Sequence, residues 1–200
     1  MARTRGTGRR TASGRSSSAR TAGRRARREE AGASTARGGA DAAHVLKRQH
    51  DETRVLFRKL ASAQGDARRS TFLELADALA AHATVEERLL YPEMARHDET
   101  ADLARDAVEE HLVMKRLLAD MLESNLPAEV FDAKCRVVED EVSRHVEEEE
   151  AILLPLARKL LGREHMSELG REIERTFTEL MRHEPRSSLP REAEGAPVFH

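Results

Sequence analysis

Apolar and histidine positions from Asp41 onward recur in alternating steps of three and four residues, the pattern of helices that bury one stripe. Four segments show it, and each stripe contains one histidine. The stripes are Leu46, His50, Thr53, Phe57 and Leu60; Phe72, Leu75, Leu79, His82, Glu86 and Leu89; Ala104, Ala107, His111, Met114, Leu118 and Met121; and Phe131, Cys135, Val138, Val142, His145, Glu149, Ile152 and Leu156. The pattern predicts four amphipathic helices with seams of the a/d type.

Short breaks separate the four segments near Gly65, His97 and Pro127. Connections of this length favour antiparallel neighbours. We therefore expect an all-α fold, an up-down-up-down four-helix bundle over residues 41–161.

The flanking segments differ in pattern from the bundle. Residues 162–183 are amphipathic at helical spacing and predict an additional C-terminal helix packed on the bundle exterior. Residues 184–200 contain three prolines and predict a flexible tail. Residues 1–40 contain eleven arginines, two glutamates and little that is apolar, so we expect a disordered basic N-terminal arm with a charge of +9.

The composition agrees with a helical, cytoplasmic protein. Charged residues make up 35% of the chain and aromatic residues only 3%, which disfavours a sheet sandwich. Cys135 is the only cysteine, which excludes an intrachain disulfide and suits a reducing compartment. No run approaches the roughly 20 apolar residues of a membrane span.

Two of the predicted helices carry the same motif, in which histidine is followed four residues later by two glutamates. HATVEE begins at His82 and HVEEEE begins at His145, and LLYP at 89–92 matches ILLP at 152–155. The repeat extends to the preceding helices, because His50 lies 32 residues before His82 and His111 lies 34 residues before His145. The chain is thus two copies of a helical hairpin.

Spacing of four residues places a histidine and a glutamate one turn apart on one helix face, where both reach a common point in the bundle. Glu86 and Glu149 would cost several kcal/mol each if buried without a partner, and metal ligation removes that cost. The alternative is that the histidines are ordinary core residues and that both glutamates pair with basic side chains. The symmetric repetition of all six groups favours the metal.

This arrangement resembles the hemerythrin HHE cation-binding domain over roughly residues 41–160. The resemblance implies a non-haem di-iron centre, with manganese or zinc as possible substitutes. The ligands that it implies are His50 and His82 on one side, His111 and His145 on the other, and Glu86 and Glu149 as bridges.

One departure from the oxygen-carrying members bears on function. They have a further histidine one turn after the third-helix ligand, where this chain has Lys115. Fewer histidines leave more open metal positions, so we expect interaction with oxygen, peroxide or nitric oxide in sensing, storage or detoxification rather than reversible oxygen carriage. A catalase-like or peroxidase-like enzyme is one alternative. A metal-stabilised bundle whose arm binds a polyanion or a protein is another, although the arm lacks features of specific nucleic-acid recognition. The oligomeric state stays open.

Neighbours of the proposed ligands have simpler interpretations. Tyr91 lies five residues beyond Glu86, about 140° around an α-helix, and is expected to serve in packing. Glu87 and Glu150 are expected to be solvated, with a supporting contact to the ligands as the alternative.

Overall fold

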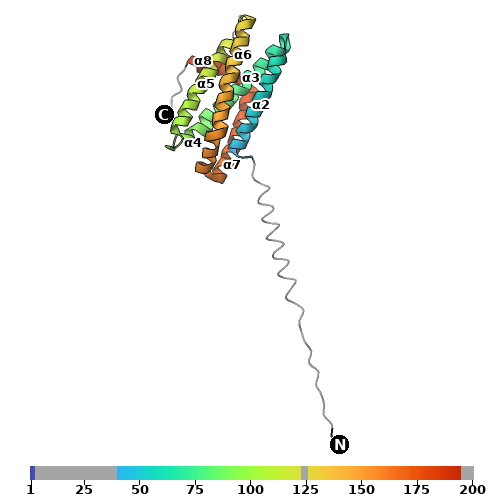
Figure 1. The fold of residues 1–200 in the computed structure, drawn as a ribbon, viewed down its shortest axis with the longest axis vertical. Coiled ribbons are helices and arrows are strands. Elements are labelled where there is room, and N and C mark those ends of the chain that lie inside the picture. Colours follow the sequence, from blue (N-terminus) through green and yellow to red (C-terminus); the bar gives the residue numbers. More distant parts are fainter. Residues whose placement is uncertain (3–39, 123–125, 195–200) are drawn as a thin grey trace. The chain divides into compact units, whose positions relative to one another are not determined.

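In the computed structural model, residues 1–2, 40–122 and 126–194 are described, and the helices below belong to the unit Gly39–His200. The described residues form helices and turns without a strand. Four long helices lie side by side (Figure 1): α2 (Ala42–Ser62), α3 (Gly65–Val85), α5 (Ala101–Leu122) and α6 (Ala128–Glu148). The predicted all-α bundle with an additional helix is confirmed, whereas the predicted arm lies outside the described residues.

The motif helices are interrupted just after each His-x-x-x-Glu. Five-residue π-helical segments, η1 (Glu86–Leu90) and η2 (Glu149–Leu153), begin at the two glutamates. They lead into α4 (Tyr91–Met94) and α7 (Leu154–Leu180), each with proline in its first turn. Proline suits that position because it lacks the amide hydrogen that would bond back along the helix.

The additional helix is the second half of α7. Gly162 adopts φ 74° and ψ 170° inside α7, a conformation open to glycine, and the chain bends there. The following stretch packs against α2 and α3 and buries Met166 and Ile173. This part of α7 thereby covers a further side of the hydrophobic core.

Residues 185–194 differ from the flexible tail that their prolines suggested. After the 3₁₀ turn η3 (Met181–His183), they form a second 3₁₀ turn, η4 (Pro185–Ser188), and then the short helix α8 (Leu189–Glu194). Helix α8 contacts α5. Leu189 is fully buried, and Arg186 forms an ion pair with Asp77 of α3. One apolar anchor and one ion pair are local features that a compositional argument does not detect.

The core consists of two apolar clusters, one around Leu46, Leu90 and Ile173 and the other around Phe57, Leu79 and Leu118. The histidines and glutamates of the seams lie where each helix passes from one cluster to the other, and they form a buried polar layer. None of the described helices has the length and apolar content needed to cross a bilayer.

Candidate metal centre

The polar layer brings together all six residues that the sequence pattern singled out. His50 comes from the middle of α2, His111 from the middle of α5, and the two His/Glu pairs from the ends of α3 and α6 and the starts of the π segments. Each of the six is 6% exposed or less. The structure therefore places ionisable groups where a bundle normally holds aliphatic side chains.

These residues form two overlapping groups that could each hold a metal ion. One contains His50, His82, Glu86 and Glu149, and the other contains Glu86, His111 and His145, with ligand atoms within 4.8 Å of one another in each. Glu86 belongs to both groups. Glu149 lies between them as well, with Oε2 3.4 Å from His50 Nε2 and 3.9 Å from His145 Nε2.

Each imidazole uses Nδ1 for a neighbouring polar side chain. The pairs are His50 with Glu150 at 3.0 Å, His82 with Gln49 at 2.9 Å, His111 with Glu87 at 3.0 Å and His145 with Glu110 at 2.8 Å. An ionised carboxylate only accepts hydrogen bonds, so Nδ1 carries a proton in the three histidines that have a glutamate partner. Their Nε2 atoms are left to face the centre, in the tautomer that binds metals.

The Nε2 atoms of His111 and His145 face each other at 3.1 Å. With both Nδ1 atoms donating to carboxylates, two neutral rings would direct lone pairs at one another, so this contact requires either a proton between the two nitrogens or a cation. In addition, His50 Nε2, His82 Nε2, Glu86 Oε1 and Glu149 Oε2 are buried without a hydrogen bond to any described residue. Buried polar atoms are rarely left so, and the donor set fits a cation.

The two glutamates differ in their tendency to ionise. Burial, with the carboxylate of Glu149 next to it, raises the pKa of Glu86 well above its ordinary value. Burial acts in the same direction on Glu149, but His50, whose Nε2 lies 3.4 Å from Glu149 Oε2, and the nearby His145 and His82 hold the pKa of Glu149 well below its ordinary value. Without a cation, two buried carboxylates this close share a proton.

Tyr91 is part of the centre and not a packing residue. Its hydroxyl is buried, 2.9 Å from Glu149 Oε1, 3.2 Å from Glu86 Oε2 and 3.4 Å from His111 Nε2. The π segment explains this, because the Tyr91 amide bonds to the Glu86 carbonyl five residues back and so stands above it. The estimate of 140° assumed an uninterrupted α-helix. Burial and the two glutamates raise the pKa of Tyr91 well above its ordinary value.

Sequence reasoning anticipated the partners of the histidines only in part. Glu87 and Glu150 contact ring nitrogens, which was the alternative to the solvated state expected for them, and Gln49 and Glu110 were not considered. A signal was present, since Gln49 and Glu110 each precede a seam histidine at equivalent places of the repeat.

Two cavities differ in their relation to the centre. One of about 40 Å³ reaches His145 and Glu149 and is lined by the acidic side chains of Asp106, Glu110 and Glu148. It is large enough for a water-sized molecule.

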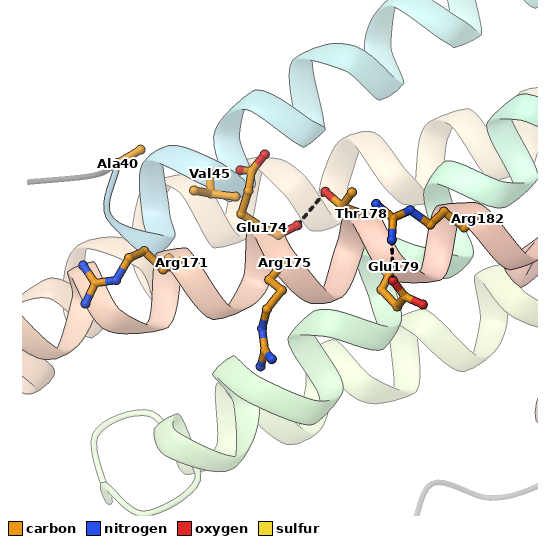
Figure 2. Close-up of a pocket in the computed structure, with 9 residues that line it drawn as sticks. Ala40, Val45, Arg171, Glu174, Arg175, Thr178, Glu179 and Arg182 are labelled. Carbon is orange, nitrogen blue, oxygen red and sulfur yellow. Dashed lines mark hydrogen bonds and ion pairs between the residues drawn. The ribbon is translucent and has the colours of Figure 1, made fainter.

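A larger cavity, about 440 Å³, lies along the outer part of α7 beside the start of α2 (Figure 2). Its lining includes none of the six predicted ligands, and two of its charged side chains, Arg182 and Glu179, pair with each other at 2.8 Å. Of these two cavities, only the smaller one reaches residues of the candidate centre.

Comparison with known proteins agrees with this arrangement. The family model for the hemerythrin HHE cation binding domain matches residues 41–157. A DNA nickase of Nostoc sp. (strain PCC 7120 / SAG 25.82 / UTEX 2576) is 28% identical over 129 residues, which are 64% of this chain and 36% of that protein. This chain thus spans about a third of the relative's length.

The fold has a counterpart among solved structures. The crystal structure of a hemerythrin HHE cation binding domain-containing protein, a homolog from Mycobacterium kansasii, superposes with a TM-score of 0.67. The two sequences are 22% identical, and the match covers 77% of this chain and 99% of that one. This likeness shows the fold.

Proposed function

Since this chain belongs to the hemerythrin HHE cation binding domain family, we propose that it binds two non-haem iron ions and that the pair reacts with oxygen, peroxide or nitric oxide. The proposed ligands are His50 and His82 on one iron, His111 and His145 on the other, and Glu86 and Glu149 as bridges. Manganese or zinc are possible substitutes, because a set of imidazoles and carboxylates suits all three metals.

The facing nitrogens of His111 and His145, 3.1 Å apart, carry the proposal. A bound cation would take the place of a proton between these two nitrogens, and the carboxylates behind the rings direct both Nε2 atoms at that place. A bound metal cation would also offset the free-energy cost of burying two glutamates, because buried carboxylates without a positive partner destabilise the bundle.

When bound, irons that change between the ferrous and ferric states would supply electrons for the reduction of oxygen or peroxide. The chain's own groups fit a small reactant. The cavity at His145 and Glu149 admits a molecule of about the size of water, and its acidic lining disfavours anions. The protonated phenol of Tyr91 holds a proton next to both carboxylates.

Iron content and peroxide consumption together test the proposal. Protein produced in iron-rich medium and purified without a histidine tag should contain about two irons per chain, as a carboxylate-bridged pair requires. It should show near-ultraviolet charge-transfer bands and consume hydrogen peroxide only when loaded. Protein that takes up no transition metal would exclude the function; a loaded protein with a long-lived, reversible oxygen adduct would favour oxygen storage instead.

A second candidate function belongs to residues 1–40. Their charge of +9 suits a polyanion, and one relative of the chain is a DNA nickase. We propose non-specific nucleic-acid binding through this segment, measured as an affinity for duplex DNA that falls steeply with salt because counterions are released. The affinity should disappear when residues 1–40 are deleted, while iron content is retained. Equal affinity after the deletion would exclude this role.

A further inference from the structure

Lys115 is a buried lysine next to the candidate metal centre. It follows His111 by one turn of α5, and its side chain is only 7% exposed. Its ammonium lies 2.8 Å from Glu87 Oε2 and 3.0 Å from Glu192 Oε2. A lysine so deeply buried requires such partners, because an unpaired charge in this environment is strongly destabilising. Lys115 is therefore held in place by one carboxylate from η1 and one from α8.

Glu87 connects this lysine to the imidazole of His111. One oxygen of Glu87 lies 3.0 Å from His111 Nδ1, and the other accepts from Lys115. A carboxylate held at both oxygens has a fixed orientation, which fixes the ring behind it. The order of contacts is Glu192, Lys115, Glu87 and His111, so the chain of contacts runs from the C-terminal helix to the metal side.

The other half of the repeat has a corresponding cation, Arg54, which is exposed to solvent where Lys115 is covered by α8. Arg54 follows His50 by one turn and lies 3.1 Å from Glu150, which in turn contacts His50. The Arg54 side chain is 41% exposed, and water solvates it. On the His111 side, the Glu192 carboxylate of α8 contacts the corresponding cation, Lys115, where water contacts Arg54. The two halves thus differ in how the supporting carboxylate is neutralised.

The segment that supplies Glu192 is anchored independently of the centre. Leu189 is fully buried, Arg116 Nε donates to the Ala193 carbonyl at 3.2 Å, and Ser188 Oγ lies 2.5 Å from Glu192 Oε1. These contacts direct one carboxylate oxygen of Glu192 at Lys115 and the other at Ser188. Figure 1 shows α8 beside α5, where this contact is made.

We propose that Lys115 and Glu192 are positioning residues for His111, so that docking of α8 determines how tightly the His111 side of the centre holds its metal. The inference rests on the proposed iron pair. Loosening α8 would let water reach Lys115, free Glu87 to reorient, and release metal from the His111 and His145 side before the His50 and His82 side.

Ferrous-iron release from the full-length protein tests this proposal. Loaded protein is mixed anaerobically with excess ferrous chelator, and release is followed by absorbance. Glu192→Gln should accelerate the faster phase about threefold and Lys115→Met about tenfold, at the lower edge of the 10- to 100-fold cost of losing a direct ligand partner. Glu194→Gln is the matched control, since it makes the same change on the exposed side of the same helix.

A double substitution separates positioning from general loss of stability. If Glu192 acts through Lys115, adding Glu192→Gln to Lys115→Met should change the release rate no further. Melting temperatures with and without iron complete the test, because a positioning role reduces the increment due to iron, whereas a structural role lowers both values equally. Parental release rates in Glu192→Gln and Lys115→Met overturn the inference, and a parent that binds no iron overturns the proposed function instead.

Discussion

The Tyr91 hydroxyl lies 2.9 Å from Oε1 of Glu149, a residue of the opposite hairpin. The contact joins the two halves of the repeat through the centre of the bundle. The equivalent residue of the second half is Leu154, which has no hydroxyl to offer to Glu86. The centre therefore has one phenol, on one side.

Tyr91→Phe should destabilise the metal-free protein by roughly 1–3 kcal/mol, because it leaves a buried carboxylate oxygen without its donor. Denaturant unfolding of iron-free protein measures the change. Leu154→Met, a volume-conserving change at the equivalent place of the repeat, is the control and should cost less than about 1.5 kcal/mol. Equal unfolding midpoints for the parent and Tyr91→Phe would contradict the contact.

Gln49→Glu and Glu110→Gln should shift metal affinity in opposite directions. Gln49 supports His82 with a neutral amide, whereas Glu110 supports His145 with a carboxylate at the equivalent place of the repeat. A carboxylate makes the imidazole a more basic ligand, so Glu110→Gln should weaken binding of its metal by roughly 10- to 100-fold. Gln49→Glu should strengthen binding. Competition with a chelator of known affinity measures both, and shifts of the same sign would refute the argument.

His145→Ala should lower iron content and iron-dependent stability together. It removes a proposed ligand, and it leaves the Glu149 carboxylate buried beside a site that binds less of the cation that would neutralise it. Metal analysis and thermal melting give the two values. His44→Ala serves as the control because His44 is exposed on the far side of α2. Parental iron content in both variants would show that the seam residues are not the ligands.

Gly170→Ala should destabilise the protein, opposite to the usual effect in a helix, where alanine is about 1 kcal/mol better than glycine. An added Cβ would lie 2.5 Å from the Ala40 carbonyl oxygen and 2.8 Å from the Ala42 amide nitrogen. Because these are backbone atoms, α7 must move away from the start of α2, at a cost of roughly 1–3 kcal/mol. Chemical denaturation measures the sign of the change in the free energy of unfolding. A stabilised variant would show that the helices separate freely.

Asp41 should make the stability of the bundle depend on acid pH. Its side chain caps α2 through the His44 amide at 2.8 Å and pairs with Arg158 at 2.8 Å, and the hydrogen bond with Arg158 lowers the pKa of Asp41. A lowered pKa in the folded state means that the contribution is complete above the unfolded value of about 3.9 and is lost as the pH falls through the folded value.

Asp41→Asn keeps the cap and removes the charge, so its deficit relative to the parent should be constant near neutral pH and shrink in acid. Asp41→Ala should cost about 1 kcal/mol more through loss of the cap. Unfolding curves between pH 7 and pH 3 measure both. A deficit that grows in acid would contradict the assigned ion pair.

The buried positions of the seams were predictable up to Glu86 and Glu149, and the positions after these two residues were not. Leu46, Leu79 and Leu118 are buried as the periodicity indicated. After Glu149, however, Leu153 is buried where Ile152 was expected, and Ile152 is 46% exposed. The π segment inserts one residue, and an insertion of this kind changes the register without any marker in the hydrophobic pattern.

The hydrogen-bond partners of the centre were harder to predict for a related reason. Glu87 follows Glu86 in a sequence rich in acidic residues, and an α-helical projection turns it away from the seam. Glu192 lies in a stretch whose prolines suggested no structure at all. Both contacts depend on three-dimensional placement that composition and spacing do not encode.

The π turns occur at the same point in both hairpins, beginning at Glu86 and at Glu149. The inserted residue is therefore part of the repeated unit, and each hairpin has it at the same place. Two identical copies of that unit would form a symmetric centre. The symmetry is broken at three pairs of equivalent positions, Tyr91 and Leu154, Gln49 and Glu110, and Arg54 and Lys115. Under the proposed function, the two ions of this centre would therefore not be equivalent.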